Sequence, residues 1–227
     1  MIQTCNRSEL KYLINKMDHM VLSRKLKMVL AMDPHAGPDG YQVKSVYFDD
    51  FSDHAWLDNL MGAGEREKFR IRYYNDDPSF INLEKKVKVM TKGTKQISRL
   101  TQAQAQSMIE GNFDVLKDTK DPLLREFYLK AKQNGFRAKV IVAYQREPYV
   151  YEPGSVRITL DHAIGNSLDV RRFFDPTLVM VPQLAQQCLL EVKFDRILPE
   201  VVRTIIQVPG TTQTAHSKYS ISRLFNT

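Results

Sequence analysis

Cations occupy every second position at the start of the segment 68–74, which reads Lys-Phe-Arg-Ile-Arg-Tyr-Tyr. In a β-strand, successive side chains point to opposite faces, so Lys68, Arg70 and Arg72 share one face and apolar side chains share the other. Lysine offers a point charge and arginine a planar pair of donors, and both bind phosphate oxygens. The spacing therefore predicts a strand whose charged face either meets water or binds a polyanion.

At least five segments, this one included, have one apolar face and one charged face. Like charges on neighbouring strands repel, and a merely solvated surface is better served by mixed signs. We therefore expect the charged faces to bind a polyanion inside a wet barrel, with the apolar faces directed outward beneath helices. The cations on these faces are Lys11, Lys68, Arg70, Arg72, Lys86, Lys88, Arg146, Arg157 and Lys193, and the carboxylates are Glu9, Glu84, Asp161 and Glu191.

The carboxylates among these cations have two interpretations. They either form ion pairs or supply oxygen ligands to a hard divalent cation whose shell phosphate oxygens complete. Glu9, Glu84 and Glu191 are the candidate ligands, whereas for Asp161 a pair with an arginine is slightly favoured. A metal together with several cations would neutralise a phosphoryl group during in-line transfer.

The composition is that of an ordinary globular protein, with 227 residues of which 43% are hydrophobic and 26% charged. The formal net charge of +7 is compatible with nucleic acid, a membrane surface or phosphorylated ligands. The chain shows no recognisable nucleic-acid-binding module, so we expect no nucleic-acid partner.

Cys5 and Cys188 form neither a zinc motif nor a disulfide framework, which favours a reducing compartment. No stretch approaches the roughly 20 apolar residues that span a bilayer, so a cytoplasmic protein is expected. The five histidines show no metal-ligand spacing, and surface or loop positions are expected for most of them: His19, His35, His54, His162 and His216.

Period-two and helical patterns alternate along the chain and predict a single α+β domain over residues 1–227. Ser52, Thr101 and Asp121 are the expected helix caps. Strands are expected at 7–13, 41–49, 66–74, 80–90, 92–99, 139–151, 155–162, 167–174 and 187–195. Helices are expected at 16–32, 52–60, 102–110, 123–134, after Pro199, and at 217–225.

Taken in order, these motifs resemble the polyphosphate polymerase domain of the vacuolar transporter chaperone complex, in the triphosphate tunnel metalloenzyme superfamily. Any one of these motifs is weak evidence, whereas the whole set, in this order and over nearly the whole chain, is strong evidence. The matching pieces are RSELKY at 7–12, SVYFD at 45–49, KFRIRYY at 68–74, LEKKVK at 83–88, YQR at 144–146, VRITLD at 156–161, LEVKF at 190–194 and SKYS at 217–220.

The resemblance implies an antiparallel β-barrel tunnel of about eight strands, surrounded by helices. It implies that lysines and arginines bind ATP and inorganic polyphosphate. It also implies that a glutamate, foremost Glu191, binds Mn²⁺ or Mg²⁺. The implied reaction is transfer of the γ-phosphoryl group of ATP to a growing polyphosphate chain. The implied catalytic residues, which also contact phosphate, are Lys11, Arg70, Arg72, Lys86, Arg146 and Lys193. Further implied phosphate contacts are Lys218, Ser217, Arg157 and Arg99.

The chain departs from the superfamily pattern at two places. Many hydrolases carry Glu-x-Glu-x-Lys where this chain has Arg7, Glu9 and Lys11, which suits the polymerase subgroup better than a two-metal hydrolase. The segment 92–99 lacks the expected pair of basic residues, so its register is left open.

Fungal relatives carry a phosphosensing domain and membrane helices that this sequence lacks. A stand-alone bacterial type is therefore expected, working with a separate membrane protein. Hydrolysis of tri- or polyphosphate, and non-catalytic sensing of polyphosphate or nucleotide, remain alternatives to synthesis.

Overall fold

The computed structural model describes residues 2–5, 7–90, 92–183, 187–215 and 217–224. Its strands are β1 Ile2–Cys5, β2 Ser8–Asn15, β3 Ala31–Met32, β4 Tyr41–Asp49, β5 Glu65–Tyr74, β6 Asp77–Val89, β7 Lys92–Leu100, β8 Arg137–Tyr151, β9 Val156–Ser167, β10 Val181–Pro182 and β11 Gln187–Phe194. Its α-helices are α1 Lys16–Val29, α2 His54–Leu60, α3 Gln102–Ile109, α4 Pro122–Asn134, α5 Glu200–Ile206 and α6 Lys218–Leu224.

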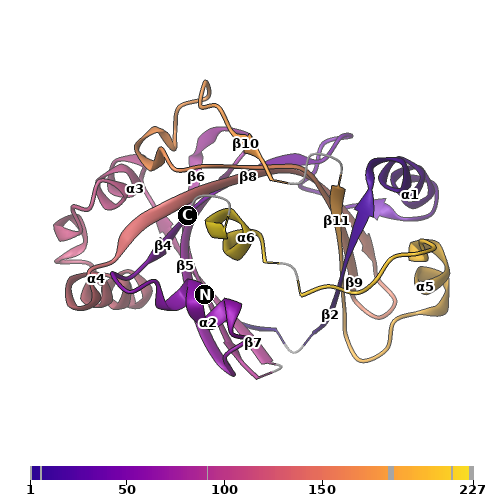
Figure 1. Cartoon of the computed structure of the whole chain (residues 1–227), viewed down its shortest axis with the longest axis horizontal. Coiled ribbons are helices and arrows are strands. Elements are labelled where there is room, and N and C mark those ends of the chain that lie inside the picture. Colours follow the sequence, from indigo (N-terminus) through magenta and orange to yellow (C-terminus); the bar gives the residue numbers. More distant parts are fainter. Residues whose placement is uncertain (1, 6, 91, 184–186, 216, 225–227) are drawn as a thin grey trace.

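One antiparallel sheet runs through the molecule, in the order β1-β7-β6-β5-β4-β8-β9-β11-β2. The short strands β3 and β10 pair with β8 and β9 beside this path. The sheet bends into an arch (Figure 1), and no ladder joins β1 to β2 within the described residues. The α+β antiparallel fold is thus confirmed, whereas the predicted closed barrel is not, because the two end strands do not pair with each other.

The outer side of the arch is covered by helices, α3 and α4 at one end and α1 and α5 at the other (Figure 1). Beneath α4, the fully buried ring of Phe127 lies 5.2–5.8 Å from four other phenylalanine rings. Beneath α1, Leu22 and Leu26 pack against apolar side chains of β9 and β11. The outward apolar faces of the strands therefore form the two main cores.

The inner, concave side of the arch holds α6, which the sequence did not predict there (Figure 1). Tyr219 of α6 packs against inward apolar side chains that include Val43, Val142 and Leu189. The inner faces of the strands are therefore not uniformly charged. We correct the expectation that all helices lie outside, because an apolar patch on the concave side gives α6 a surface to bury.

Local capping confirms most of the predicted helix starts. Thr101 forms a capping box with Gln104, and Asp121 accepts hydrogen bonds from the backbone amides that begin α4. The predicted Ser52 cap is wrong. The first amides of α2 instead donate to the carboxylates of Asp49 and Asp50.

Two other predicted boundaries are also wrong. The segment 167–174 forms the end of β9 and a 3-10 turn, Val170–Arg172. Phe173, which follows the turn, packs on Tyr73 in the hydrophobic core beneath α4. The predicted helix 16–32 ends at Val29, and Ala31–Met32 pairs with β8 instead. In the described part of the chain, no helix is long and apolar enough to cross a membrane.

Replacing Phe127 by Ala should lower the free energy of unfolding by about 3–5 kcal/mol, because the change opens a cavity among four aromatic rings. Urea denaturation followed by circular dichroism measures this loss. Leu129→Ala on the same helix is the control, since Leu129 is half exposed and should lose about 0.5 kcal/mol or less. Equal losses in both variants would contradict the described packing of α4.

Candidate functional site

Three lysines lie side by side on neighbouring strands at the concave side. Lys68 of β5 is opposite Lys86 of β6, and Lys86 is opposite Lys95 of β7. This pairing settles the register that the sequence left open for residues 92–99. Sequence reasoning missed Lys95, although its spacing from Arg99 already placed the two cations on one face of that segment.

The pKa of all three lysines is lowered, with burial as the largest cause in each case. Burial, followed by the charges of Lys86 and Lys11, lowers the pKa of Lys68 to about 7. Burial also lowers the pKa of Lys95 to about 8, although the nearby carboxylate of Glu84 opposes the shift. An anion placed beside this row would favour the protonated lysines, because an opposite charge stabilises the charged form.

Glu84 is held between two cations. Its Oε2 accepts a hydrogen bond from Nε of Arg70 at 2.7 Å and lies 2.6 Å from Nη2 of the same arginine. Its Oε1 accepts a hydrogen bond from Nζ of Lys95 at 2.7 Å. Burial alone would raise the pKa of Glu84, but Arg70 above all holds it far below the ordinary value. The arrangement is that of a cross-strand ion pair, and it fixes the guanidinium of Arg70.

Arg72 is a buried cation whose hydrogen bonds reach uncharged hydroxyl groups. Its side chain is 5% exposed, and it donates to Oγ of Ser45 at 2.9 Å and to the hydroxyl of Tyr144 at 3.2 Å. Neither partner carries a negative charge. Burial and the charge of Arg70 oppose protonation of Arg72, but Tyr144 and the charge of Glu84 favour it, and the pKa of Arg72 is raised. An anion on the concave side would favour the charged form further.

A second group of charges lies on β8, β9, β11 and α6. Arg146 donates to both oxygens of Asp161, at 2.6 and 2.7 Å, so the arginine pair favoured from the sequence is present. Lys218 Nζ lies 2.6 Å from Asp161 and 3.1 Å from Glu191. Burial alone would raise the pKa of Asp161, but Arg146 and Lys218 hold it below its ordinary value.

The end strand β2 and its neighbour β11 contribute longer and more accessible contacts. Lys11 Nζ lies 3.7 Å from both Glu9 and Glu191, and Lys193 Nζ lies 3.5 Å from Glu9. The side chains of Lys11 and Lys193 are 21% and 35% exposed. These ion pairs are longer than those of Glu84 and Asp161, and their lysines are partly exposed to solvent.

Helix α6 brings two more of the predicted residues to the site. Tyr219 stacks on Tyr47 and donates to Asp49 at 2.6 Å, which fastens the helix to the sheet. The residues at its start then reach across the concave side, where Lys68 donates to Oγ of Ser217 at 3.0 Å. The C-terminal segment therefore links the two charged groups.

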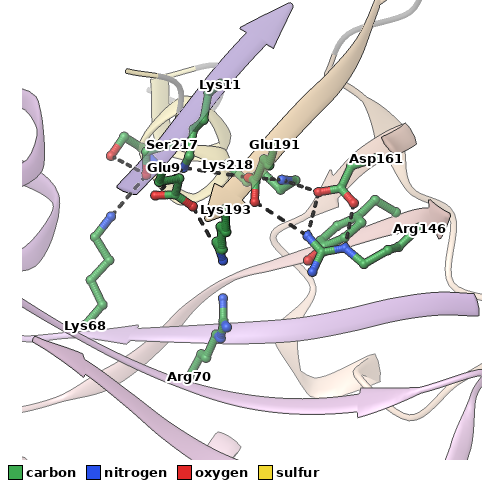
Figure 2. A network of polar contacts seen from close by, with 12 residues as sticks. Glu9, Lys11, Lys68, Arg70, Arg146, Asp161, Glu191, Lys193, Ser217 and Lys218 are labelled. Carbon is green, nitrogen blue, oxygen red and sulfur yellow. Dashed lines mark hydrogen bonds and ion pairs between the residues drawn. The ribbon is translucent and has the colours of Figure 1, made fainter. Parts of the chain in front are cut away.

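Figure 2 shows the two groups facing each other. Lys68 and Arg70 extend from one side, and Glu9, Lys193 and Glu191 extend from the other (Figure 2). The fold thus gathers side chains that are far apart in the sequence around one concave surface, as the alternation predicted.

Three residues predicted to contact phosphate either lie outside the two charged groups or interact with other side chains. Lys88 lies two residues beyond the lysine row, opposite Gly93. Arg157 forms an ion pair with Asp33 at 3.0 Å. The guanidinium of Arg99 lies 3.5 Å from the centre of the Phe80 ring at the far end of β7.

The candidate metal ligands are not equivalent. Among the described residues, the oxygens of Glu9, Glu84 and Glu191 do not all come within 4.8 Å of one another. The two oxygens of Glu84 accept hydrogen bonds from cations. Glu191 also accepts a hydrogen bond from Lys218, at 3.1 Å, but Arg146 lies 3.9 Å from its other oxygen. Lys11 lies 3.7 Å from both Glu9 and Glu191. These longer contacts make Glu9 and Glu191 better candidates than Glu84 for oxygen ligands of a hard divalent cation.

Replacing Asp161 by Asn should lower the free energy of unfolding by about 3–5 kcal/mol near neutral pH, because Arg146 and Lys218 lose a buried counter-ion. The folded pKa of Asp161 lies below its unfolded value, so its stabilising contribution is complete above about pH 4 and fades on acidification. Chemical denaturation at several pH values measures this change.

The control is Asp169→Asn, since Asp169 is exposed and should change stability by about 0.5 kcal/mol or less. The assigned charges would be contradicted if the difference in the free energy of unfolding between Asp161→Asn and the wild-type protein grew as the pH fell.

The match to a family model agrees with the resemblance. No curated protein matches the sequence significantly. The PH1819 protein of Pyrococcus horikoshii OT3 is similar in structure, with 12% identity, a TM-score of 0.49, and coverage of 96% of this chain and 99% of that chain. A presumed adenylate cyclase from Bacillus halodurans has 16% identity, a TM-score of 0.48, and coverage of 91% and 94%. The VTC domain model matches residues 6–225, so the chain belongs to the VTC domain family.

Proposed function

We propose that this protein transfers the γ-phosphoryl group of ATP to a growing inorganic polyphosphate chain, with Mn²⁺ or Mg²⁺, on the concave side of the arch. The observation that carries the proposal is the unbalanced charge of the residues gathered there. Among the described residues, Glu9, Glu84, Asp161 and Glu191 lie among nine cations, which are Lys11, Lys68, Arg70, Arg72, Lys86, Lys95, Arg146, Lys193 and Lys218.

The two charged groups would hold phosphates between them. Arg70 and Arg72 have guanidinium groups fixed by hydrogen bonds, and such groups suit bidentate contacts to the triphosphate of ATP. Phosphoryl transfer needs little covalent help from the protein, so catalysis rests on in-line positioning and on fixed positive charge around the equatorial oxygens. The chain of phosphates would then run along the concave side as through a tunnel, with α6 forming part of its wall.

The remaining cations would have different roles that depend on how exposed they are to solvent. Lys11, Lys86, Lys95 and Lys193 are partly or fully accessible to solvent and would guide and neutralise the acceptor chain. Arg146 and Lys218 are nearly buried and would keep Glu191 ionised and oriented. Glu191 and Glu9 would hold the divalent cation, which when bound neutralises phosphate oxygens.

The purified protein with ATP and Mn²⁺ should produce polymer that a polyphosphate dye detects. Glu191→Gln should lower the rate at least about tenfold, because it removes a carboxylate proposed to hold the metal. Glu200→Gln, whose side chain is 77% exposed on α5, should keep the wild-type rate.

Two other results of this assay would replace the proposal. Orthophosphate released from tripolyphosphate without polymer would identify a hydrolase, in which water is the acceptor. Binding of polyphosphate without any turnover would identify a sensor.

Binding of tripolyphosphate should take up protons at a pH about one unit above the pKa of Lys68, because the anion restores the protonated lysine. Calorimetry in buffers with different ionisation enthalpies measures the uptake. Lys68→Gln should reduce the uptake by up to one proton per site, while ionisation of the ligand itself contributes equally to both proteins. The same uptake in the variant would show that Lys68 does not face the bound phosphates.

A further inference from the structure

Three side chains with metal-binding chemistry meet on the outer side of the arch, beneath α1. His19 comes from α1, Glu147 from β8 and His162 from β9. Glu147 and His162 directly follow the inward-facing Arg146 and Asp161 in their strands, so they point away from the concave side. The cluster is therefore separated by the sheet from the proposed phosphate site.

The distances within this cluster match those around one small cation. Oε1 of Glu147 lies 2.9 Å from Nε2 of His19 and 3.6 Å from Nε2 of His162. All three ligand atoms lie within 4.8 Å of one another. Neighbouring ligands of a tetrahedral Zn²⁺ ion lie about 3.4 Å apart, given its bond lengths to nitrogen and oxygen. Only small side-chain shifts would be needed to place an ion between them.

The carboxylate of Glu147 is already oriented for such a role. Its Oε2 accepts hydrogen bonds from the hydroxyls of Ser23 at 2.6 Å and Tyr149 at 2.7 Å. These bonds leave Oε1 directed at the two imidazoles. Hydrogen-bonded partners of this kind fix the orientation of ligating groups in metal sites.

The surroundings of the cluster shift the pKa of Glu147 and of His162. Burial alone would raise the pKa of Glu147, but hydrogen bonds from His19, Ser23 and Tyr149 lower it to about 2. Burial, with a further contribution from His19, lowers the pKa of His162.

We propose that His19, Glu147 and His162 form a binding site for Zn²⁺ or a similar transition-metal ion, with a water molecule as the fourth ligand. Two imidazoles and one carboxylate are a donor set that suits Zn²⁺ and differs from the all-oxygen set preferred by Mg²⁺. The ion would link α1 to β8 and β9, so its role would be structural. The expectation of surface or loop positions is wrong for these two histidines, whose side chains are 12% and 30% exposed.

The test is titration of the chelator-treated, full-length protein with Zn²⁺ and with Co²⁺. Zn²⁺ should bind in a ratio of one ion per chain at this site and raise the melting temperature, and Co²⁺ should give the intense visible absorption of tetrahedral coordination. His162→Gln and Glu147→Gln should each weaken binding at least a hundredfold. His35→Gln, which changes an exposed histidine in a loop, should leave binding unchanged.

Two further measurements separate this site from the alternatives. Glu191→Gln should leave the Co²⁺ absorption intact, whereas its loss would assign the ion to the concave side and overturn the proposal. In the wild-type protein, Zn²⁺ should shift the imidazole nitrogen resonances of His19 and His162, a readout that does not depend on the folding of any variant. Unshifted resonances would show that the cluster is only a hydrogen-bonded group.

Discussion

Repulsion among like charges on the concave side is the constraint on which the rest of this structure depends. Three lysines lie opposite one another on adjacent strands, and the nearly buried Arg72 donates, within the described part of the chain, to the hydroxyl groups of Ser45 and Tyr144. Such an arrangement costs stability in the free protein, because desolvated cations repel. The lowered pKa of Lys68 expresses that cost. A bound polyanion would remove it, so a feature that is unfavourable for folding becomes favourable for binding.

The fold tolerates this crowding because its cores lie elsewhere. The outer helices bury the apolar faces of the strands, and the aromatic cluster around Phe127 and the aliphatic cluster around Leu26 stabilise the two ends of the arch. The carboxylates on the concave side are few, and the most buried of them, Glu84 and Asp161, each hold two cations in defined positions. The strands thus hold the charged side chains in fixed positions before a ligand binds.

Much of this site could be predicted from the sequence, because alternation is a local property of a strand. The pattern of Lys68, Arg70 and Arg72 placed them on one face without knowledge of any partner strand. The features that were not predicted depend on contacts between residues far apart in the sequence. The spacing of Lys95 from Arg99 places both on one face of β7, but the position of Lys95 opposite Lys86 depends on the pairing of β7 with β6. The position of α6 inside the arch depends on the docking of Tyr219, and the pairing of His19 with His162 depends on how α1 packs on the sheet.

The most direct test of the account is calorimetric titration of tripolyphosphate into the wild-type protein and the Arg72→Met variant. Methionine keeps an unbranched, flexible side chain at the buried position, and Arg171→Met provides an exposed control. We expect binding to weaken by about ten- to a hundredfold in Arg72→Met, the loss of one charged hydrogen-bonded contact, and to stay unchanged in the control. Wild-type affinity in a folded Arg72→Met protein would contradict the claim that phosphates bind on the concave side.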